Sequence, residues 1–178
     1  MATLTITEAL QQIKTSLARI ASKRGEVTSR VAQDSRMVDP LQNQGGTREF
    51  IKAALQSVQD LEKRIVALRV GINQANLNSS VEINGDSRTV AEWLVWKREL
   101  VSNQQTFFVQ VSRNIQTGRN NAGTANRTLQ AGAAPVDVTV FIDERKFAAD
   151  TEHLNEVLSV LDGRLSAFNA THTIEVAD

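Results

Sequence analysis

The chain has no cysteine, so disulfides, thiol nucleophiles and thiolate metal sites are excluded. It has no tyrosine, and its aromatic residues are six phenylalanines and two tryptophans. That number is too small for a stacking platform that binds single-stranded nucleic acid. No apolar run approaches the roughly 20 residues that a membrane-spanning helix needs. The first residues lack the pattern of a signal peptide, so we expect a protein that is neither secreted nor transmembrane.

Net charge is also absent, because 20 basic residues balance 20 acidic ones. The balance is uneven along the chain. Residues 1–135 carry 17 basic and 11 acidic side chains, whereas residues 136–178 carry 3 and 9. Such asymmetry either steers the acidic part of one molecule onto the basic part of another or reflects an unevenly mixed surface.

Residues for catalysis are equally sparse. The two histidines, His153 and His172, lack a third ligand at a spacing suited to zinc. No metalloprotease, nucleophile-elbow or phosphate-loop motif occurs. Asp143 and Glu144 are most simply the charged start of a helix. The sequence therefore predicts a protein that is not an enzyme and has no catalytic residues, cofactor, metal or small-molecule substrate.

Helical periodicity dominates what is present. Thr5 and Glu8 form a capping box that opens a helix, which Asp39-Pro40 brings to an end. A second helix follows the turn at 43–47, with Thr47 as its expected N-cap. Apolar residues recur every three or four positions in both segments, which predicts an antiparallel helical hairpin. They are Ile6, Leu10, Ile13, Leu17 and Ile20 in the first segment, and Ile51, Leu55, Val58, Leu61, Ile65, Leu68 and Ile72 in the second.

The stretch Ser79–Arg88 interrupts this pattern. Val81 and Ile83 alternate with polar residues as in a strand, and Asn84-Gly85 is a strong turn signal. A second capping box, Thr89 with Glu92, then opens a third helix that carries many aromatic residues. Tryptophan and phenylalanine dominate interface hot spots, so these side chains form either core or a partner-binding patch. The candidate interface residues on this helix are Trp93, Trp96, Phe107 and Phe108.

The remaining chain has two parts. Residues 117–135 show no clear periodicity and are expected to form a flexible loop. Its basic residues, Arg119 and Arg127, lack the aromatic or motif support that would predict nucleic-acid binding. Residues 136–178 are expected to form a strand, a helix and a strand that pack on the bundle or on a neighbouring subunit. Strands at 80–83, 136–142 and 171–176 either form a small sheet or pair between subunits. The candidate interface residues in these strands are Val138, Val140, Ile174 and Val176.

Several short motifs occur in order along the chain. An Ile-Asn-x-x-Asn step is followed by a polar reversal with glycine and a helix start, and a Leu-Asp pair precedes a late asparagine. The matching positions are Ile72, Asn73, Asn76, Gly85, Thr89, Glu92, Leu94, Leu161, Asp162 and Asn169. In this order the chain resembles the septicolysin-like family of small helical bacterial and phage proteins, although Ala170 stands where that family usually has tryptophan. The resemblance implies an antiparallel helical hairpin with a small β element.

Together these features predict a mainly α protein with minor β structure. Residues 1–116 would form the hairpin and third helix, 117–135 the loop, and 136–178 the strand–helix–strand element. We expect a structural or assembly protein, either a phage virion component such as a capsid decoration or head-associated protein, or a cytoplasmic adaptor. Its partners would be copies of itself and a capsid shell. A membrane-acting cytolysin, which the family name suggests, would need a Trp-rich membrane loop that the sequence lacks.

Overall fold

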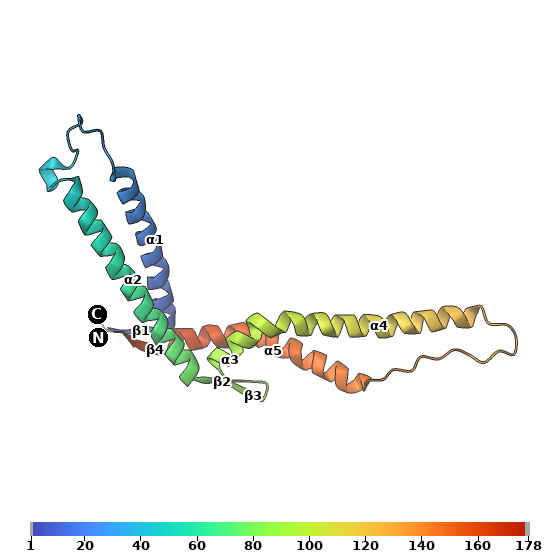
Figure 1. The fold of residues 1–178 in the computed structure, drawn as a ribbon. Helices are drawn as coiled ribbons and strands as arrows, with labels where there is room; N and C mark the ends of the chain where they lie inside the picture. The colour runs from blue at the N-terminus through green and yellow to red at the C-terminus, as the bar shows by residue number, and fades with distance from the viewer. Residues whose placement is uncertain (1, 177–178) are drawn as a thin grey trace. The chain divides into compact units, whose positions relative to one another are not determined.

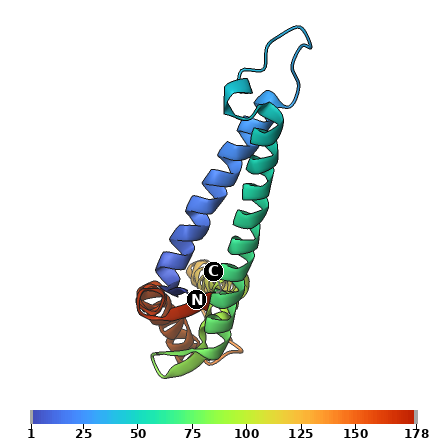
Figure 2. The ribbon, with the colours of Figure 1, turned by 90° about the vertical axis from the view of Figure 1, so that its left-hand side faces the viewer.

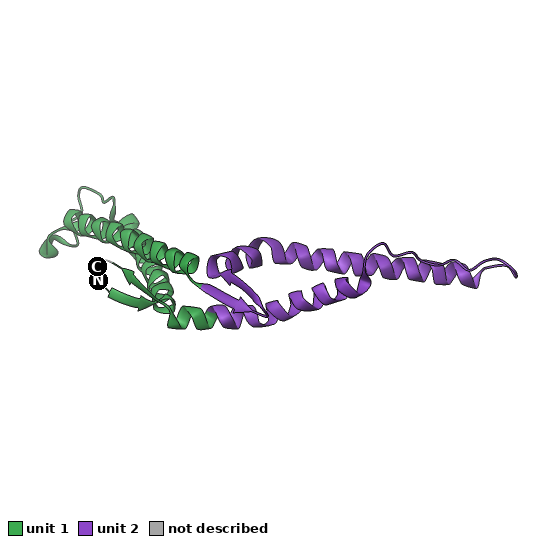
Figure 3. Ribbon diagram, turned by 90° about the horizontal axis from the view of Figure 1, so that it is seen from below, with its two compact units in different colours: residues 1–79, 166–178 green, residues 80–165 purple. Residues whose placement is uncertain are grey.

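The computed structural model describes residues 2–176 and is mainly helical with short antiparallel strands, as the sequence predicts (Figure 1). The chain divides into two compact units, coloured separately in Figure 3. Unit 1 comprises residues 1–79 and 166–178, and unit 2 comprises residues 80–165. This division differs from the predicted one because the C-terminal strand pairs with the N-terminal strand. Within residues 2–176, no helix is both long and apolar enough to cross a membrane.

Unit 1 is built on a helical hairpin. Helix α1 (Ile6–Arg30) and helix α2 (Thr47–Asn78) lie side by side and antiparallel (Figure 2). The predicted capping box is present at the start of α1, where the Glu8 main-chain N–H donates to Thr5 Oγ1 at 3.2 Å and the Thr5 N–H donates to Glu8 Oε2 at 2.8 Å. The hairpin core consists of Ile6, Ala9, Ile13 and Ile20 from α1 with Ala54, Val58, Leu68 and Ile72 from α2.

The connection between the two helices is longer than predicted. Helix α1 ends at Arg30 rather than near Asp39-Pro40, and the connection includes the short 3-10 turn η1 (Gln42–Gln44). Thr47 is the first residue of α2 rather than its N-cap. The cap comes from Asp39, whose carboxylate accepts bonds from the Thr47 hydroxyl at 2.6 Å and main-chain N–H at 2.8 Å. These bonds, led by the hydroxyl, hold the pKa of Asp39 below its usual value.

Unit 1 also contains a two-stranded sheet. Strand β1 (Ala2–Thr5) pairs antiparallel with strand β4 (Thr173–Val176), and Leu4 lies opposite Ile174. Strand β4 also packs on α2, where a Cβ at Gly71 would lie 3.3 Å from Cδ1 of Ile174. Glycine at this position therefore permits the close approach of strand and helix. The C-terminal strand is confirmed, whereas β1 was not predicted.

Unit 2 begins with the predicted reversal. Strands β2 (Ser80–Ile83) and β3 (Asp86–Thr89) pair antiparallel around Asn84-Gly85, whose φ angles of 51° and 86° suit a tight hairpin turn. The second capping box then opens α3 (Val90–Val95), with the Glu92 main-chain N–H 3.2 Å from Thr89 Oγ1. A π-helical turn, η2 (Trp96–Leu100), joins α3 to α4 (Val101–Arg127).

Helix α4 corrects the predicted loop. Residues 117–127 are helical, so the prediction of a loop beginning at Thr117 is wrong over this range. Gly118, Ala122 and Ala125 lie on one face of this helix. Their side chains are too small to produce a recognisable hydrophobic periodicity in the sequence. Only residues 128–135 are non-helical there, and the chain then runs extended to Asp143.

Helix α5 (Glu144–Thr171) follows this extended segment and contributes residues to both units. Its start agrees with the charged helix start predicted from Asp143-Glu144. Asp143 Oδ1 accepts hydrogen bonds from the main-chain N–H groups of Arg145 at 3.0 Å and Lys146 at 3.1 Å. The buried side chains of unit 2 are Ile83, Val90, Trp93, Val101, Leu154, Val157, Leu161 and Leu165.

A candidate interaction groove between two helices

Trp93 lies in α3, and Trp96 is the first residue of the π-helical turn η2. Trp93 is 0% exposed, and its indole Nε1–H donates to the carbonyl oxygen of Val81 at 2.9 Å. Trp96 is half-buried and meets Trp93 edge to face, with ring centroids 5.4 Å apart. Trp93 therefore belongs to the core of unit 2 and offers no side-chain surface to a partner.

Arg88 completes this tryptophan cluster. Its guanidinium carbon lies 4.6 Å from the ring centroid of Trp93 and 5.6 Å from that of Trp96. The same guanidinium lies 3.4 Å from Asp86 Oδ2, which is also 3.4 Å from His153 Nε2. The negative faces of both indole rings thus already hold a cation from the chain itself.

The phenylalanines form a second cluster, shared by α4 and α5. The ring centroids of Phe107 and Phe108 are 5.9 Å apart, and Phe147 of α5 lies 5.1 Å from Phe108 and 6.4 Å from Phe107. Phe107 is 58% exposed, whereas the other two rings are half-buried. The candidate residues Phe107 and Phe108 thus form one ring cluster, and Phe107 presents much of its side chain to solvent.

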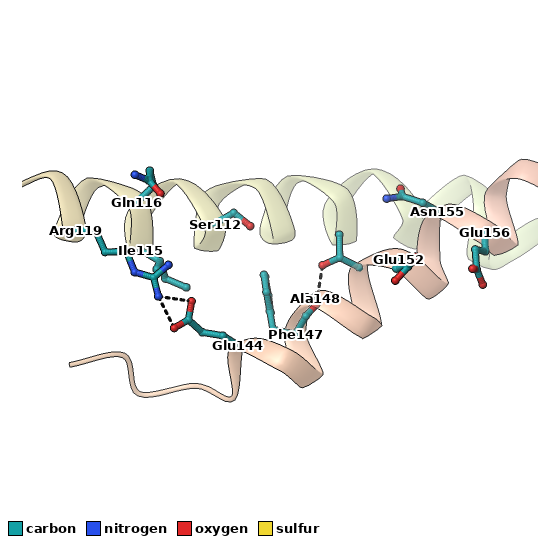
Figure 4. A pocket seen from close by; sticks show the side chains of 11 residues that line it. Ser112, Ile115, Gln116, Arg119, Glu144, Phe147, Ala148, Glu152, Asn155 and Glu156 are labelled. Carbon is teal, nitrogen blue, oxygen red and sulfur yellow. Dashed lines mark hydrogen bonds and ion pairs between the residues drawn. The ribbon is translucent and has the colours of Figure 1, made fainter. Parts of the chain in front are cut away.

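A groove of about 570 Å³ lies beside this cluster between α4 and α5 (Figure 4). Ile115, Phe147 and Ala148 contribute its apolar surface. At one end Arg119 forms a two-pronged ion pair with Glu144, with Nη2–O distances of 2.6 and 2.7 Å. The polar residues that line the groove are Ser112, Gln116, Thr151, Glu152, Asn155 and Glu156.

The groove is suited to holding apolar groups. The Arg119 guanidinium is already paired, and the Thr151 hydroxyl donates to the Phe147 carbonyl of its own helix at 2.8 Å. No histidine lines the groove, so neither Ser112 nor Thr151 has an imidazole base beside it. Among residues 2–176, no three histidine or acidic side chains are grouped so that they could hold a metal ion. The arrangement can bind an apolar side chain or helix face between polar edges.

The segment 136–142 lies extended but is not a strand, so the prediction of a strand there is wrong. Asn126 binds it instead, because its side-chain amide accepts from the Val136 N–H at 2.7 Å and donates to the Val136 carbonyl at 2.8 Å. Val138 and Val140 are half-buried, and Val138 Cγ1 would lie 3.5 Å from a Cβ at Gly118. The alternation therefore reflects packing on α4. Phe141 is 94% exposed.

The other two candidate residues lie in unit 1. Ile174 and Val176 are buried in β4, which pairs with β1 of the same chain. Their alternation reflects one face of the β1–β4 sheet that packs on the core of unit 1. The edge of β4 that faces β1 is therefore occupied within the chain.

Opposite charges from the two parts of the chain meet inside unit 2. Helix α4 carries three arginines and no acidic residue, and its Arg119 pairs with Glu144 of α5. Lys97 of the π-helical turn pairs with Asp162 of α5. At these positions the opposite charges of the two parts of the chain pair α4 and the π-helical turn with α5.

Sequence reasoning missed the roles of five side chains at these sites. Phe147 and Phe141 carry ordinary apolar signals, but only the packing shows that one ring is clustered and the other is exposed. Arg88 and the pair Arg119–Glu144 depend on contacts between separate elements. The absence of acidic residues in α4 was the one available signal for its pairing with an acidic helix.

Comparison of the whole chain with protein-family models, with curated proteins and with solved structures finds no significant match.

Proposed function

We propose that this protein is a non-enzymatic assembly protein that binds other protein chains along α4 and the segment that follows it. One observation carries the proposal. Among the 27 residues of α4, Val101 alone is buried. Long helices in proteins owe most of their stability to packing of an apolar face, and α4 has little such packing within the chain.

The exposed apolar side chains support the same reading. Phe107 and Val109 of α4 are largely exposed, and Phe141 is almost fully exposed. Phe107 borders Phe147, which lines the groove between α4 and α5. Exposed aromatic side chains beside an apolar groove are typical of protein-binding surfaces, where they act as anchors in a partner's pocket.

The more specific form of the proposal is a phage virion component, such as a capsid decoration or head-associated protein. Its support is the resemblance to a family of bacterial and phage proteins. In that setting the partners would be further copies of the chain and a capsid shell. The alternative setting is a cytoplasmic adaptor, for which the same exposed side chains of α4 would serve.

Site-specific photocrosslinking in the producing cells tests the binding surface. A photoreactive phenylalanine analogue replaces Phe107 or Phe141, and the control places it at Thr106, an exposed residue on another face of α4. We expect discrete crosslinked protein bands from Phe107 and Phe141 but not from Thr106. Equal crosslinking at all three positions, or none at any, would contradict the proposal.

Quantitative peptide mass spectrometry of purified virus particles from the source tests the setting. A copy number on the order of hundreds per particle would support a capsid decoration protein, because the shell repeats by symmetry. About a dozen copies would instead place the protein at a symmetric vertex structure such as the portal or tail. Absence from particles would overturn the virion setting and favour the adaptor.

A further inference from the structure

The extended segment 136–142 has main-chain groups that the chain itself does not pair (Figure 1). Within residues 2–176, the main chain of residues 134–142 forms no hydrogen bond to another main-chain group. The segment consists largely of valine, threonine, phenylalanine and isoleucine, the residue types that are enriched in strands. An extended segment of this composition with unpaired N–H and C=O groups is a template for pairing with another chain.

One edge of the segment is already engaged. In an extended chain, the N–H and C=O groups of one residue point to the same edge, and those of the next residue point to the opposite edge. Both groups of Val136 bind the side-chain amide of Asn126 in α4, at 2.7 and 2.8 Å. The Val138 N–H donates to Oδ1 of Asp137 at 2.7 Å. We call this edge, which carries the main-chain groups of Val136, Val138 and Val140, the closed edge.

The opposite edge is formed by the main-chain groups of Asp137, Thr139 and Phe141. All three residues are exposed, and none of their N–H and C=O groups forms a main-chain hydrogen bond within residues 2–176. Val138, by contrast, is half-buried and packs on α4 at Gly118. Helix α4 therefore covers one face of the segment and leaves this second edge accessible. We call it the open edge.

We propose that the open edge pairs with the open edge of a second copy of this chain, as two antiparallel strands related by a two-fold axis at Thr139. This inference rests on the proposed function, because it names the partner of the segment that follows α4. Thr139 of each copy exchanges both main-chain hydrogen bonds with Thr139 of the other, and Asp137 does the same with Phe141 of the other copy. The register uses open-edge residues alone and leaves the bonds to Asn126 intact.

The side chains of the segment are self-complementary in this register, which identifies a second copy as the occupant. Val136 lies opposite Ile142 of the other copy, and Val138 lies opposite Val140, so β-branched pairs line one face. Thr139 lies opposite Thr139 on the other face. Cross-strand pairs of these kinds stabilise a sheet. A shift of the register by one residue would place the apolar side chains of the two copies on opposite faces.

The charges favour the antiparallel arrangement. Asp137 is the only charged residue of segment 136–142, and in this register it lies opposite Phe141 of the second copy. Parallel pairing in register would instead set Asp137 beside Asp137, and like charges directly opposite each other are destabilising. The next carboxylate, Asp143, would lie opposite Pro135, and it already accepts main-chain hydrogen bonds at the start of α5.

Helix α4 does not obstruct this pairing. Because Asn126 binds the closed edge, the α4 helices of the two copies, each with three arginines and no acidic residue, lie toward the outer sides of the strand pair. Segment 136–142 is about 24 Å long at roughly 3.4 Å per residue. Such a contact is smaller than the roughly 800 Å² per partner of a stable interface, so we expect weak association. Copies arrayed on a common surface would pair more fully, because their effective concentration is higher.

Disulfide trapping detects weak contacts and reports the register, since the chain has no cysteine of its own. In Thr139→Cys the two introduced thiols flank the axis, where Cα atoms of a hydrogen-bonded pair lie about 5.5 Å apart, within disulfide range. In Asp137→Cys, the matched control on the same edge, the two Cα atoms are four residues out of register, roughly 14 Å apart. Mild oxidation of the full chain should therefore double the 19.6 kDa mass of Thr139→Cys and leave Asp137→Cys monomeric. A mixture of Asp137→Cys and Phe141→Cys should give a disulfide-linked heterodimer.

Sedimentation equilibrium of variants without cysteine tests the main-chain bonds. Thr139→Pro removes the N–H at the axis in both copies and should raise the dissociation constant more than about tenfold. Thr139→Ala keeps this N–H and should retain the dimer. Phe141→Asp should weaken association, because it faces Asp137 of the second copy, whereas Phe141→Lys should preserve it. The exposed positions of Thr139 and Phe141 allow each variant to fold, which circular dichroism checks.

Three results would overturn the inference. They are a parent chain that stays monomeric at roughly millimolar concentration, equal oxidation of Thr139→Cys and Asp137→Cys, and a dimer that Thr139→Pro leaves intact. Crosslinks from Phe107 to other proteins, together with a monomeric chain, would refute the self-pairing and leave the proposed function standing. A Thr139→Cys dimer without any crosslink in cells from Phe107 or Phe141 would refute the proposed function instead.

Discussion

Trp93 donates its indole N–H to the carbonyl oxygen of Val81 at 2.9 Å, and this bond joins α3 to strand β2. The ring is fully buried, and Arg88 from strand β3 covers its face at 4.6 Å. The β2–β3 hairpin that interrupts the long helices therefore helps to position the helix that follows it. The β2–β3 hairpin supplies both the hydrogen-bond acceptor and the cation that hold the first turn of the next helix.

Replacing Trp93 with alanine should lower the free energy of unfolding by about 3–5 kcal/mol, because a large buried ring is lost and a cavity remains. Trp93→Phe retains much of the ring and should cost less, since it mainly leaves the Val81 carbonyl without its donor. Urea unfolding followed by far-ultraviolet circular dichroism measures both values. Trp96→Ala, at a half-buried ring, is the control with a smaller expected loss. A change below about 1 kcal/mol for Trp93→Ala would show that the ring is not core.

Replacing glycine with alanine should lower the stability of the protein at Gly85 and raise it at Gly123. Gly85 has a φ of +86° in the hairpin turn, and a Cβ there would meet nothing within 4 Å, so Gly85→Ala suffers only the conformational cost of about 1–2 kcal/mol. Gly123 lies inside α4 and also has open space around it, so Gly123→Ala should stabilise by up to about 1 kcal/mol. The midpoint of thermal unfolding should fall for the first variant and rise for the second. Shifts of the same sign would contradict this account.

The elements that sequence predicted correctly rest on local signals. The two capping boxes place the starts of α1 and α3, and Asn84-Gly85 places the β2–β3 turn. Strand β3 has no such signal, because Asp86–Thr89 contains no apolar residue, and the alternation of Ala2 and Leu4 in β1 is too short to predict a strand. They become strands because β4 and β2 supply hydrogen-bonding partners, which is information that a single segment does not contain.

The candidate site was predictable only in part, for the same reason. The phenylalanines of α4 stand out by residue type, but their neighbour Phe147 lies on a different helix. The end of α4 escaped prediction because its packed face is made of Gly118, Ala122 and Ala125, which hydrophobic periodicity does not register. Such a face becomes visible only when the extended segment that packs on it is known.

The capping boxes predict a loss of stability in acid. Main-chain and hydroxyl hydrogen bonds from Thr5 hold the pKa of Glu8 below its usual value of 4.5, and those from Thr89 do the same for Glu92. A carboxylate whose pKa is lowered by folding binds fewer protons in the folded state, so its contribution is complete above the unfolded pKa and is lost as the pH falls through the folded pKa. We therefore expect the unfolding free energy to decline as the pH falls from about 5 through 4.5 and below.

Substitution of the two capping glutamates distinguishes the contribution of the capping boxes from other effects of acid on stability. The double variant Glu8→Gln, Glu92→Gln should be less stable at neutral pH and should show a shallower decline in acid. Asp150→Asn is a control, because it removes an exposed carboxylate that belongs to neither capping box, and it should keep the slope of the parent chain. Urea unfolding over the range from about pH 3 to pH 7 provides the comparison. An unchanged slope in the double variant would refute the role assigned to the caps.

The ion pair between Arg119 and Glu144 reports whether the groove beside it is open to water. Both side chains are almost half-exposed in the isolated chain, so a double-mutant cycle with Arg119→Gln and Glu144→Gln should give a coupling of only about 0.2–1 kcal/mol. The cycle cancels the separate effect of Glu144 on the start of α5. Because solvent ions screen exposed pairs, the coupling should shrink further in about 1 M salt. A coupling above about 2 kcal/mol that resists salt would mean that the pair is shielded from solvent. Since the chain alone leaves it exposed, the shield would have to be another molecule seated over this end of the groove.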